Sequence, residues 1–246
     1  LGTLFASFIT GITFTFFTYK FIIKKFKLIP RFEKLFIKSK ILKLLNINLD
    51  IFIRTLVLTF SFLWVTYQGS KFGEDYLAVN TILMQFIVLA AFFLDAYAFS
   101  TEGVVGFAIG RKNKNSFLSI VKNSIQLSFI TALIVSLFYV IFFKQIINII
   151  TDIELLRFIS YKHFLWVIII PPIASFCYQL DGIFIGASQT KEMRNAMIIS
   201  VASFIIISMY LTKYFGNHGL WFSLMCFMIL RSLTLKFYFN KILRKF

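Results

Sequence analysis

Carboxylate side chains lie inside long apolar stretches of this sequence, where they could bind a proton or a cation. Asp95 and Glu102 are seven positions apart in the stretch 76–110. In a helix this spacing places both on one face, about 10 Å apart along the axis. Asp181 lies in a later stretch, 153–187. Because an ionised group inside a membrane costs at least a few kcal/mol, such residues usually face a cavity or a charged partner.

A polar cavity is the functional interpretation of these acids. It would lie between the stretches 46–69, 76–110 and 153–187, where its carboxylates would take up H⁺ or Na⁺ and neutralise a cationic solute. Asp181 is favoured for this role, because Pro171 and Pro172 should bend its helix and open space beside it. The residues expected in the ion-coupling and substrate cavity are Asp181, Asp95, Glu102, Gln179, Tyr97, Asn80 and Gln85.

Structural ion pairs are the alternative interpretation. The two arginines within the apolar stretches, Arg54 and Arg231, would each pair with an intramembrane acid and lock helices together. For Asp50 and Arg54 this interpretation is favoured, because both lie near the predicted cytoplasmic end of their stretch. The candidate partners are Asp50, Asp95, Glu102 and Asp181.

Seven apolar stretches must position these residues. A bilayer-spanning helix needs about 20 apolar residues. The chain is 59% hydrophobic, whereas a soluble domain is about 45–50% apolar. The sequence therefore predicts an all-α, polytopic membrane bundle of seven transmembrane helices. The stretches are 1–23, 46–69, 76–110, 115–145, 153–187, 191–214 and 218–240.

The positive charge of the chain is concentrated in alternate connections between these stretches. The net charge is +16, and most of the 26 Lys and Arg residues lie in 20–43, 111–122, 191–194 and 236–245. Short loops rich in Lys and Arg stay cytoplasmic. We therefore expect a multi-pass membrane protein with a cytoplasmic C-terminus, and we place it in the bacterial inner membrane. Its basic surface should face anionic lipid headgroups, and we expect no nucleic-acid partner.

Motifs of enzyme chemistry do not occur in the sequence. It lacks the H-E-x-x-H, G-x-S-x-G and G-x-x-x-x-G-K-[ST] patterns, so we expect no enzymatic activity and no cofactor beyond a coupling ion. Cys177 and Cys226 have no metal-ligand spacing, which leaves a Na⁺ site at Asp181 as the one cation site considered. His163 and His218 lie near predicted outer helix ends and are interpreted as interfacial residues.

Five ordered segments carry a resemblance to a known family. They include Leu94-Asp95-Ala96-Tyr97-Ala98 and Tyr178-Gln179-Leu180-Asp181-Gly182, and together they span about residues 46–235. The chain resembles the C-terminal half of the multidrug and toxic compound extrusion (MATE) family, in its DinF-like branch. The complete set is 48–55, 94–110, 178–187, 193–197 and 219–231.

The resemblance implies a two-lobe transporter of which this chain is a part. Members have twelve helices in two six-helix lobes and export organic cations or amphiphiles in exchange for H⁺ or Na⁺. Residues 1–23 would be the last helix of the first lobe, 24–45 the basic cytoplasmic inter-lobe linker and 46–246 the second lobe. Because the chain begins at Leu1 within a span, we expect a fragment that lacks the N-terminal lobe. The full-length protein is expected to be a monomer.

The same resemblance places Asp181 where several relatives carry a cation-coupling carboxylate. Sodium-coupled relatives also use a Glu in the first helix of this lobe, where the present sequence has only apolar and hydroxyl residues such as Thr55 and Thr59. This departure argues against a second-lobe Na⁺ site. Because the family that this chain resembles includes both H⁺- and Na⁺-coupled transporters, both ions remain candidate coupling ions.

Three functions are compatible with the sequence. The favoured one is a secondary active multidrug or organic-cation antiporter that works by alternating access in the lipid bilayer on small amphiphilic or cationic solutes. The second is a lipid or oligosaccharide-lipid flippase of the same superfamily, and the third is a non-transporting membrane scaffold. The intramembrane acids outnumber the intramembrane bases, which favours a cationic solute.

Overall fold

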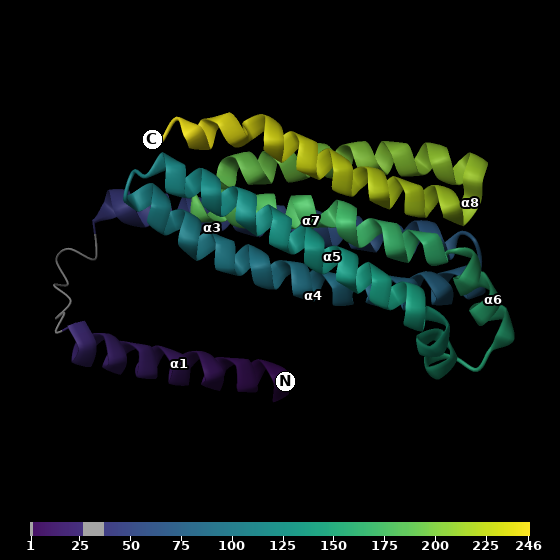
Figure 1. Ribbon diagram of the computed structural model, residues 1–246. Helices are drawn as coiled ribbons and strands as arrows, with labels where there is room; N and C mark the ends of the chain where they lie inside the picture. The colour runs from purple at the N-terminus through teal and green to yellow at the C-terminus, as the bar shows by residue number, and fades with distance from the viewer. Residues whose placement is uncertain (1, 27–36) are drawn as a thin grey trace. The chain divides into compact units, whose positions relative to one another are not determined.

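The described part of the chain is almost entirely helical. The computed structural model describes residues 2–26 and 37–246 (Figure 1). Residues 27–36, which belong to the predicted linker 24–45, lie outside the described residues. The seven helices of the described part are α1 (Gly2–Phe26), α3 (Lys38–Ser70), α4 (Glu74–Gly110), α5 (Lys114–Ile150), α6 (Glu154–Lys162), α7 (Phe164–Gly186) and α8 (Thr190–Leu243).

The chain divides into two compact units, Leu1–Asn46 and Ile47–Phe246. Within the described residues, five helices are long and apolar enough to cross a membrane, namely α3, α4, α5, α7 and α8. The predicted span 1–23 corresponds to α1, which is helical but is not among these five. The second unit contains all the candidate site residues.

Helix α7 lies at the centre of the second unit. It packs against α4, α5 and α8, and its Val167, Ile170 and Cys177 are completely buried. Large apolar side chains on the outside of the bundle point away from this core; Phe92 of α4 and Phe237 of α8 are 68% and 80% exposed. An apolar exterior around a well-packed interior is what a bundle in lipid requires.

Helix α8 contains two antiparallel halves. A straight helix of its 54 residues would be about 80 Å long, far more than the hydrocarbon core of about 30 Å. The chain reverses at Gly216, whose φ of 55° and ψ of −136° are not helical and suit a residue without Cβ. The rings of Phe204 and Phe227, one in each half, lie 5.5 Å apart, and the halves run side by side in Figure 1. They correspond to the predicted stretches 191–214 and 218–240.

The predicted helix 153–187 is wrong as one continuous element. The chain leaves the helix at His163, which separates α6 from α7. At the break His163 has a backbone φ of −100° and ψ of 4°, and its imidazole bonds to the carbonyl of Ile159 and, across the fold, to the side chain of Asn217. A local pattern of apolar residues contains no signal for that contact.

Helix α7 passes through Pro171 and Pro172 without interruption. Proline has no N–H, so Pro172 leaves the carbonyl of Ile168 without its intrahelical donor. The hydroxyl of Ser136 on α5 donates to that carbonyl at 2.8 Å. A neighbouring helix thus replaces the lost hydrogen bond, and the predicted bend at these prolines stays a prediction.

Helix α3 begins at Lys38, eight residues before the predicted boundary at residue 46. The interval from Lys38 to Gln68 contains no Gly or Pro, and its Lys, Leu and Ile residues favour helix. The end of the predicted linker, from residue 38 to residue 45, is therefore continuous with the first helix of the second unit.

Candidate functional site

A buried ion centre joins α3, α7 and α8. The carboxylate of Asp181 accepts hydrogen bonds from the guanidinium groups of Arg54 and Arg231. Asp181 is 5% exposed and Arg231 is 1% exposed, and the guanidinium of Arg231 also lies 5.5 Å from the ring centre of Tyr178. Burial of ions is tolerated when each has an opposite charge beside it. The three charged residues therefore stabilise one another and tie three helices together.

Asp95 of α4 adds a fourth charge to this centre. It interacts electrostatically with Arg231, Arg54 and Asp181, yet within the described residues no cation lies close enough to form a salt bridge with it. Its side chain is half-buried rather than enclosed. Two acids and two bases from four helices thus share one region, and Asp95 is the acid that keeps a free carboxylate.

Uncharged polar side chains link α4 to its neighbours in the same bundle. The hydroxyl of Thr101 donates to Gln179 of α7 at 3.0 Å. The hydroxyls of Thr131 on α5 and Tyr97 on α4 lie 3.0 Å apart. Thr101 and Gln179 are buried, so this part of the interface between α4 and α7 is polar at its core.

Close backbone contact brings α4 and α7 together near the charges. A Cβ on Gly182 would collide with the backbone of Ala98, and one on Gly186 would collide with the backbone of Glu102. Small residues permit such approach between membrane helices. Glu102 contributes its backbone to this contact, and its carboxylate makes no salt bridge within the described part of the chain.

Two of the predicted cavity residues lie elsewhere on α4. Asn80 and Gln85 line a pocket of about 320 Å³ between α3 and α4, together with Thr66 and Met84. Asn80 is buried in contact with Asn217, whereas Gln85 is exposed. The structure therefore assigns the seven predicted residues to different places, with Asp95 and Asp181 sharing the ion centre.

Asp50 forms an ion pair that the sequence did not suggest. Its carboxylate accepts from Arg194 at 2.6 Å and from the hydroxyl of Thr190 at 3.1 Å, both at the start of α8. In the sequence, Arg194 belongs to a predicted basic connection. The sequence gives little indication of this pairing. An arginine in a loop and an arginine in the first turn of a helix cannot be told apart until the start of the helix is known.

The described residues contain no group of three or more His, Cys, Asp or Glu side chains able to hold a metal ion. Cys177 and Cys226 are free thiols. The charged groups that converge are instead two guanidiniums and two carboxylates, a set suited to protons and charged organic solutes.

These features define a class of protein. A helical bundle with five membrane-length helices, an apolar exterior and a charged centre shared by four helices is typical of membrane transporters. The sequence model of the family described as MatE matches residues 51–212. The chain belongs to the MATE family of multi-pass membrane transporters, as its motifs predicted, and this family is not one of enzymes.

Relatives and solved structures agree with this assignment. The chain is 35% identical over 193 residues to DNA damage-inducible protein F of Escherichia coli (strain K12), covering 78% of this chain and 42% of that protein. It is 23% identical over 239 residues to Protein DETOXIFICATION 43 of Arabidopsis thaliana, covering 95% and 44%. The chain therefore spans less than half the length of these curated relatives.

The fold matches that of solved transporters. The Vibrio cholerae MATE transporter VcmN in the bent form has a TM-score of 0.81 at 16% identity, with 92% of this chain and 52% of that chain covered. A MOP superfamily transporter from Pyrococcus furiosus, described as having a binding pocket of reverse polarity that suggests a different function, has a TM-score of 0.73 at 15% identity, with 80% and 44% covered. At these identities the likeness shows the fold alone.

Proposed function

We propose that the protein of which this chain is a part is a secondary active antiporter for multidrug or organic-cation efflux. It is driven by H⁺ or Na⁺ and works by alternating access. Membership of the MATE family and the resemblance to DNA damage-inducible protein F support this proposal. The distribution of Lys and Arg supports a C-terminus in the cytoplasm, and the similarity to a protein of Escherichia coli supports a place in the bacterial inner membrane.

The observation that carries the proposal is the free carboxylate of Asp95 beside a charge-paired Asp181. With Asp95 ionised, the two acids balance Arg54 and Arg231. An organic cation could then bind to the free carboxylate. A proton on Asp95 leaves the centre with a net positive charge and repels that cation. Competition between a proton and a cation for one carboxylate is the minimum requirement of an antiporter.

Asp181 has a supporting role in this mechanism. Its carboxylate orients Arg54 of α3 and Arg231 of α8. Both guanidiniums bond to Oδ2 of Asp181, and its Oδ1 has no partner within the described residues. A Na⁺ at Asp181 would therefore lie beside two positive charges that repel it. H⁺ coupling through Asp95 is therefore the form of the proposal that the geometry favours.

The two-lobe arrangement completes the proposal. Residues 46–246 form the second lobe, 1–23 form the last helix of the first lobe and 24–45 form the linker between them. The lobes rock about a central cavity, and the remaining wall of that cavity comes from the first lobe. Chains of about twice this length in the curated relatives support this arrangement.

Transport by the complete protein in proteoliposomes tests the proposal. We expect a pH gradient to drive ethidium across the membrane. Asp95→Asn should reduce that flux at least about tenfold, because an amide cannot gain and lose the coupling proton, and a costly carboxylate within a membrane usually has such a specific role. The matched control is Asp152→Asn, which removes an acid at a fully exposed loop position and should leave the flux unchanged. Undiminished proton-driven flux in Asp95→Asn would refute the assignment.

A lipid or oligosaccharide-lipid flippase is the second candidate. Two guanidiniums at the centre favour it, because Arg binds phosphate well. The same vesicles separate the candidates. Translocation of a fluorescent anionic lipid without ethidium transport would support the flippase and contradict the antiporter.

A further inference from the structure

A second polar cluster lies far along the bundle from the ion centre, where α4, the junction of α6 with α7, and the turn of α8 meet. Its four side chains are at most 5% exposed. We call this cluster the amide latch; it consists of Asn80, His163, Asn217 and Trp221.

The latch is a directional chain of hydrogen bonds. Trp221 Nε1 donates to Asn80 Oδ1 at 2.9 Å, and Asn80 Nδ2 donates to Asn217 Oδ1 at 2.7 Å. Asn217 Nδ2 donates back to Asn80 Oδ1 at 3.0 Å and also lies 2.9 Å from His163 Nε2. His163 Nδ1 lies 2.8 Å from the carbonyl of Ile159.

Only one protonation state of His163 fits this series of hydrogen bonds. Indole nitrogen is a donor only and a carbonyl is an acceptor only, so Trp221 and Ile159 fix the direction at the two ends. Trp221 orients the amide of Asn80, which orients Asn217, whose Nδ2 then points a hydrogen at His163. His163 must therefore be neutral, with its proton on Nδ1 and a lone pair on Nε2.

A proton on His163 Nε2 cannot be accommodated locally. Asn217 would have to turn its oxygen toward the imidazolium, which places its Nδ2 against Asn80 Nδ2. If Asn80 also turned, its Nδ2 would face the N–H of Trp221. In each arrangement two donors face one another without an acceptor, a costly state for buried groups.

The latch connects the turn of α8 to the rest of the bundle. Asn217 is adjacent to Gly216, where α8 reverses, and Gly69 of α3 leaves the space that Asn80 Nδ2 occupies. We propose that the amide latch is a proton-sensitive device, in which protonation of His163 releases the turn of α8 from α4. This inference does not rest on the transport activity proposed above.

The groups facing His163 keep the latch closed at neutral pH. Burial lowers the pKa of His163 below the ordinary imidazole value, the hydrogen bond to Ile159 opposes that shift, and the charges of His218 and Lys162 lower it further. Tyr76 of α4 meets the ring edge-on at 6.2 Å, and α3 presents the uncharged Gly69. Protonation therefore requires a pH below about 6.5.

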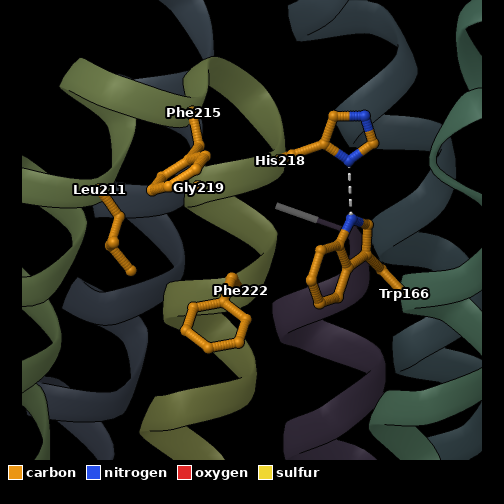
Figure 2. Close-up of a pocket in the computed structure, with 6 residues that line it drawn as sticks. All are labelled: Trp166, Leu211, Phe215, His218, Gly219 and Phe222. Carbon is orange, nitrogen blue, oxygen red and sulfur yellow. Dashed lines mark hydrogen bonds between the residues drawn. The ribbon is translucent and has the colours of Figure 1, made fainter.

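His218 connects the latch to a pocket at the surface. Its exposed ring stacks on His163, with ring centres 4.2 Å apart and an angle of 14° between the planes. Figure 2 shows Trp166 donating to His218. Both residues line a pocket of about 280 Å³. His218 thus touches His163 but makes none of the hydrogen bonds of the latch, which makes His218→Gln the matched control.

Fluorine NMR of the protein labelled with 5-fluorotryptophan, in lipid nanodiscs, tests the inference. Trp64→Phe, Trp166→Phe and Trp221→Phe variants assign the signals of the three tryptophans in this chain. As the pH falls from about 8 to about 4.5, the Trp221 signal should move in a single-proton step. His163→Gln, which keeps an acceptor but cannot take a proton, should abolish that step. His218→Gln, which leaves every hydrogen bond of the latch in place, should keep the Trp221 step.

Three results would overturn the latch. They are a Trp221 signal that does not move in the unmodified protein, a step that survives His163→Gln, and a step that His218→Gln removes. If His163→Gln does not fold, Asn80→Ala decides the question. It removes the hydrogen bonds that connect Asn217 to Trp221, so this substitution by itself must abolish the pH-dependent step of the Trp221 signal. Hydrogen exchange around Gly216, compared at one acidic pH, should be faster in the unmodified protein than in His163→Gln.

Discussion

At the scale of single residues, the proposed chemistry depends on which charges are paired. Asp181 holds two guanidiniums, Asp50 holds Arg194, and Asp95 has no salt bridge within the part of the chain that the structure describes. Chemistry that needs a carboxylate to gain and lose a proton is therefore assigned to Asp95, while Asp181 organises its surroundings.

Removal of one partner from the buried ion centre should destabilise the fold. Asp181→Ala leaves Arg54 and Arg231 uncompensated, and breaking a buried pair costs about 3–5 kcal/mol. The double variant Asp181→Leu with Arg231→Met should lose less than the two single variants together. Thermal unfolding in detergent measures both. The control is Asp152→Asn, at an exposed pair with Arg157, which should not change the melting temperature; strict additivity would exclude the pairing.

The sequence allowed the acids to be found but not their partners. Asp95, Glu102 and Asp181 stood out because ions are costly within apolar stretches. Whether Arg54 meets Asp50 or Asp181 depends on how neighbouring helices are rotated and shifted, and that is decided by packing. The latch residue Asn217 was missed because a single Asn beside Gly216 looks like an ordinary turn residue.

At the scale of helices, long apolar runs were sufficient to predict most elements, but tertiary contacts decided where some begin and end. The reversal of α8 follows from Gly216 and from a length that exceeds the bilayer. At the break between α6 and α7, His163 bonds to Asn217, 54 positions away. In α7, the donor that Pro172 cannot supply to the carbonyl of Ile168 comes from Ser136 of a different helix.

Ser136→Ala tests that dependence of one helix on another. It leaves the carbonyl of Ile168 in α7 without a donor, and an unpaired buried polar group costs about 1–3 kcal/mol. We expect a lower melting temperature and faster hydrogen exchange in α7. Ser124→Ala on the same helix is the control, since Ser124 bonds only to the carbonyl of Val121 in its own helix. Equal effects of the two substitutions would contradict the role of Ser136.

At the scale of the whole molecule, the proposed transporter needs a lobe with a charged inner wall and an apolar outer wall. Asp95 and Phe93 lie on the same helix two positions apart, and at 3.6 residues per turn they point to opposite sides of it. In the proposed transporter Asp95 faces a water-filled cavity, whereas Phe93, which is 50% exposed, faces lipid. One side of α4 should therefore contact water and the opposite side should contact lipid.

Thiol accessibility tests this central claim most directly. In the complete protein, with Cys177 and Cys226 replaced by Ala, Asp95→Cys and Phe93→Cys are treated in lipid vesicles with a membrane-impermeant maleimide. We predict that Asp95→Cys reacts, while Phe93→Cys stays unmodified. If Asp95→Cys reacts no faster than Phe93→Cys, the acid does not face a watery cavity and the transport mechanism proposed for this site is wrong.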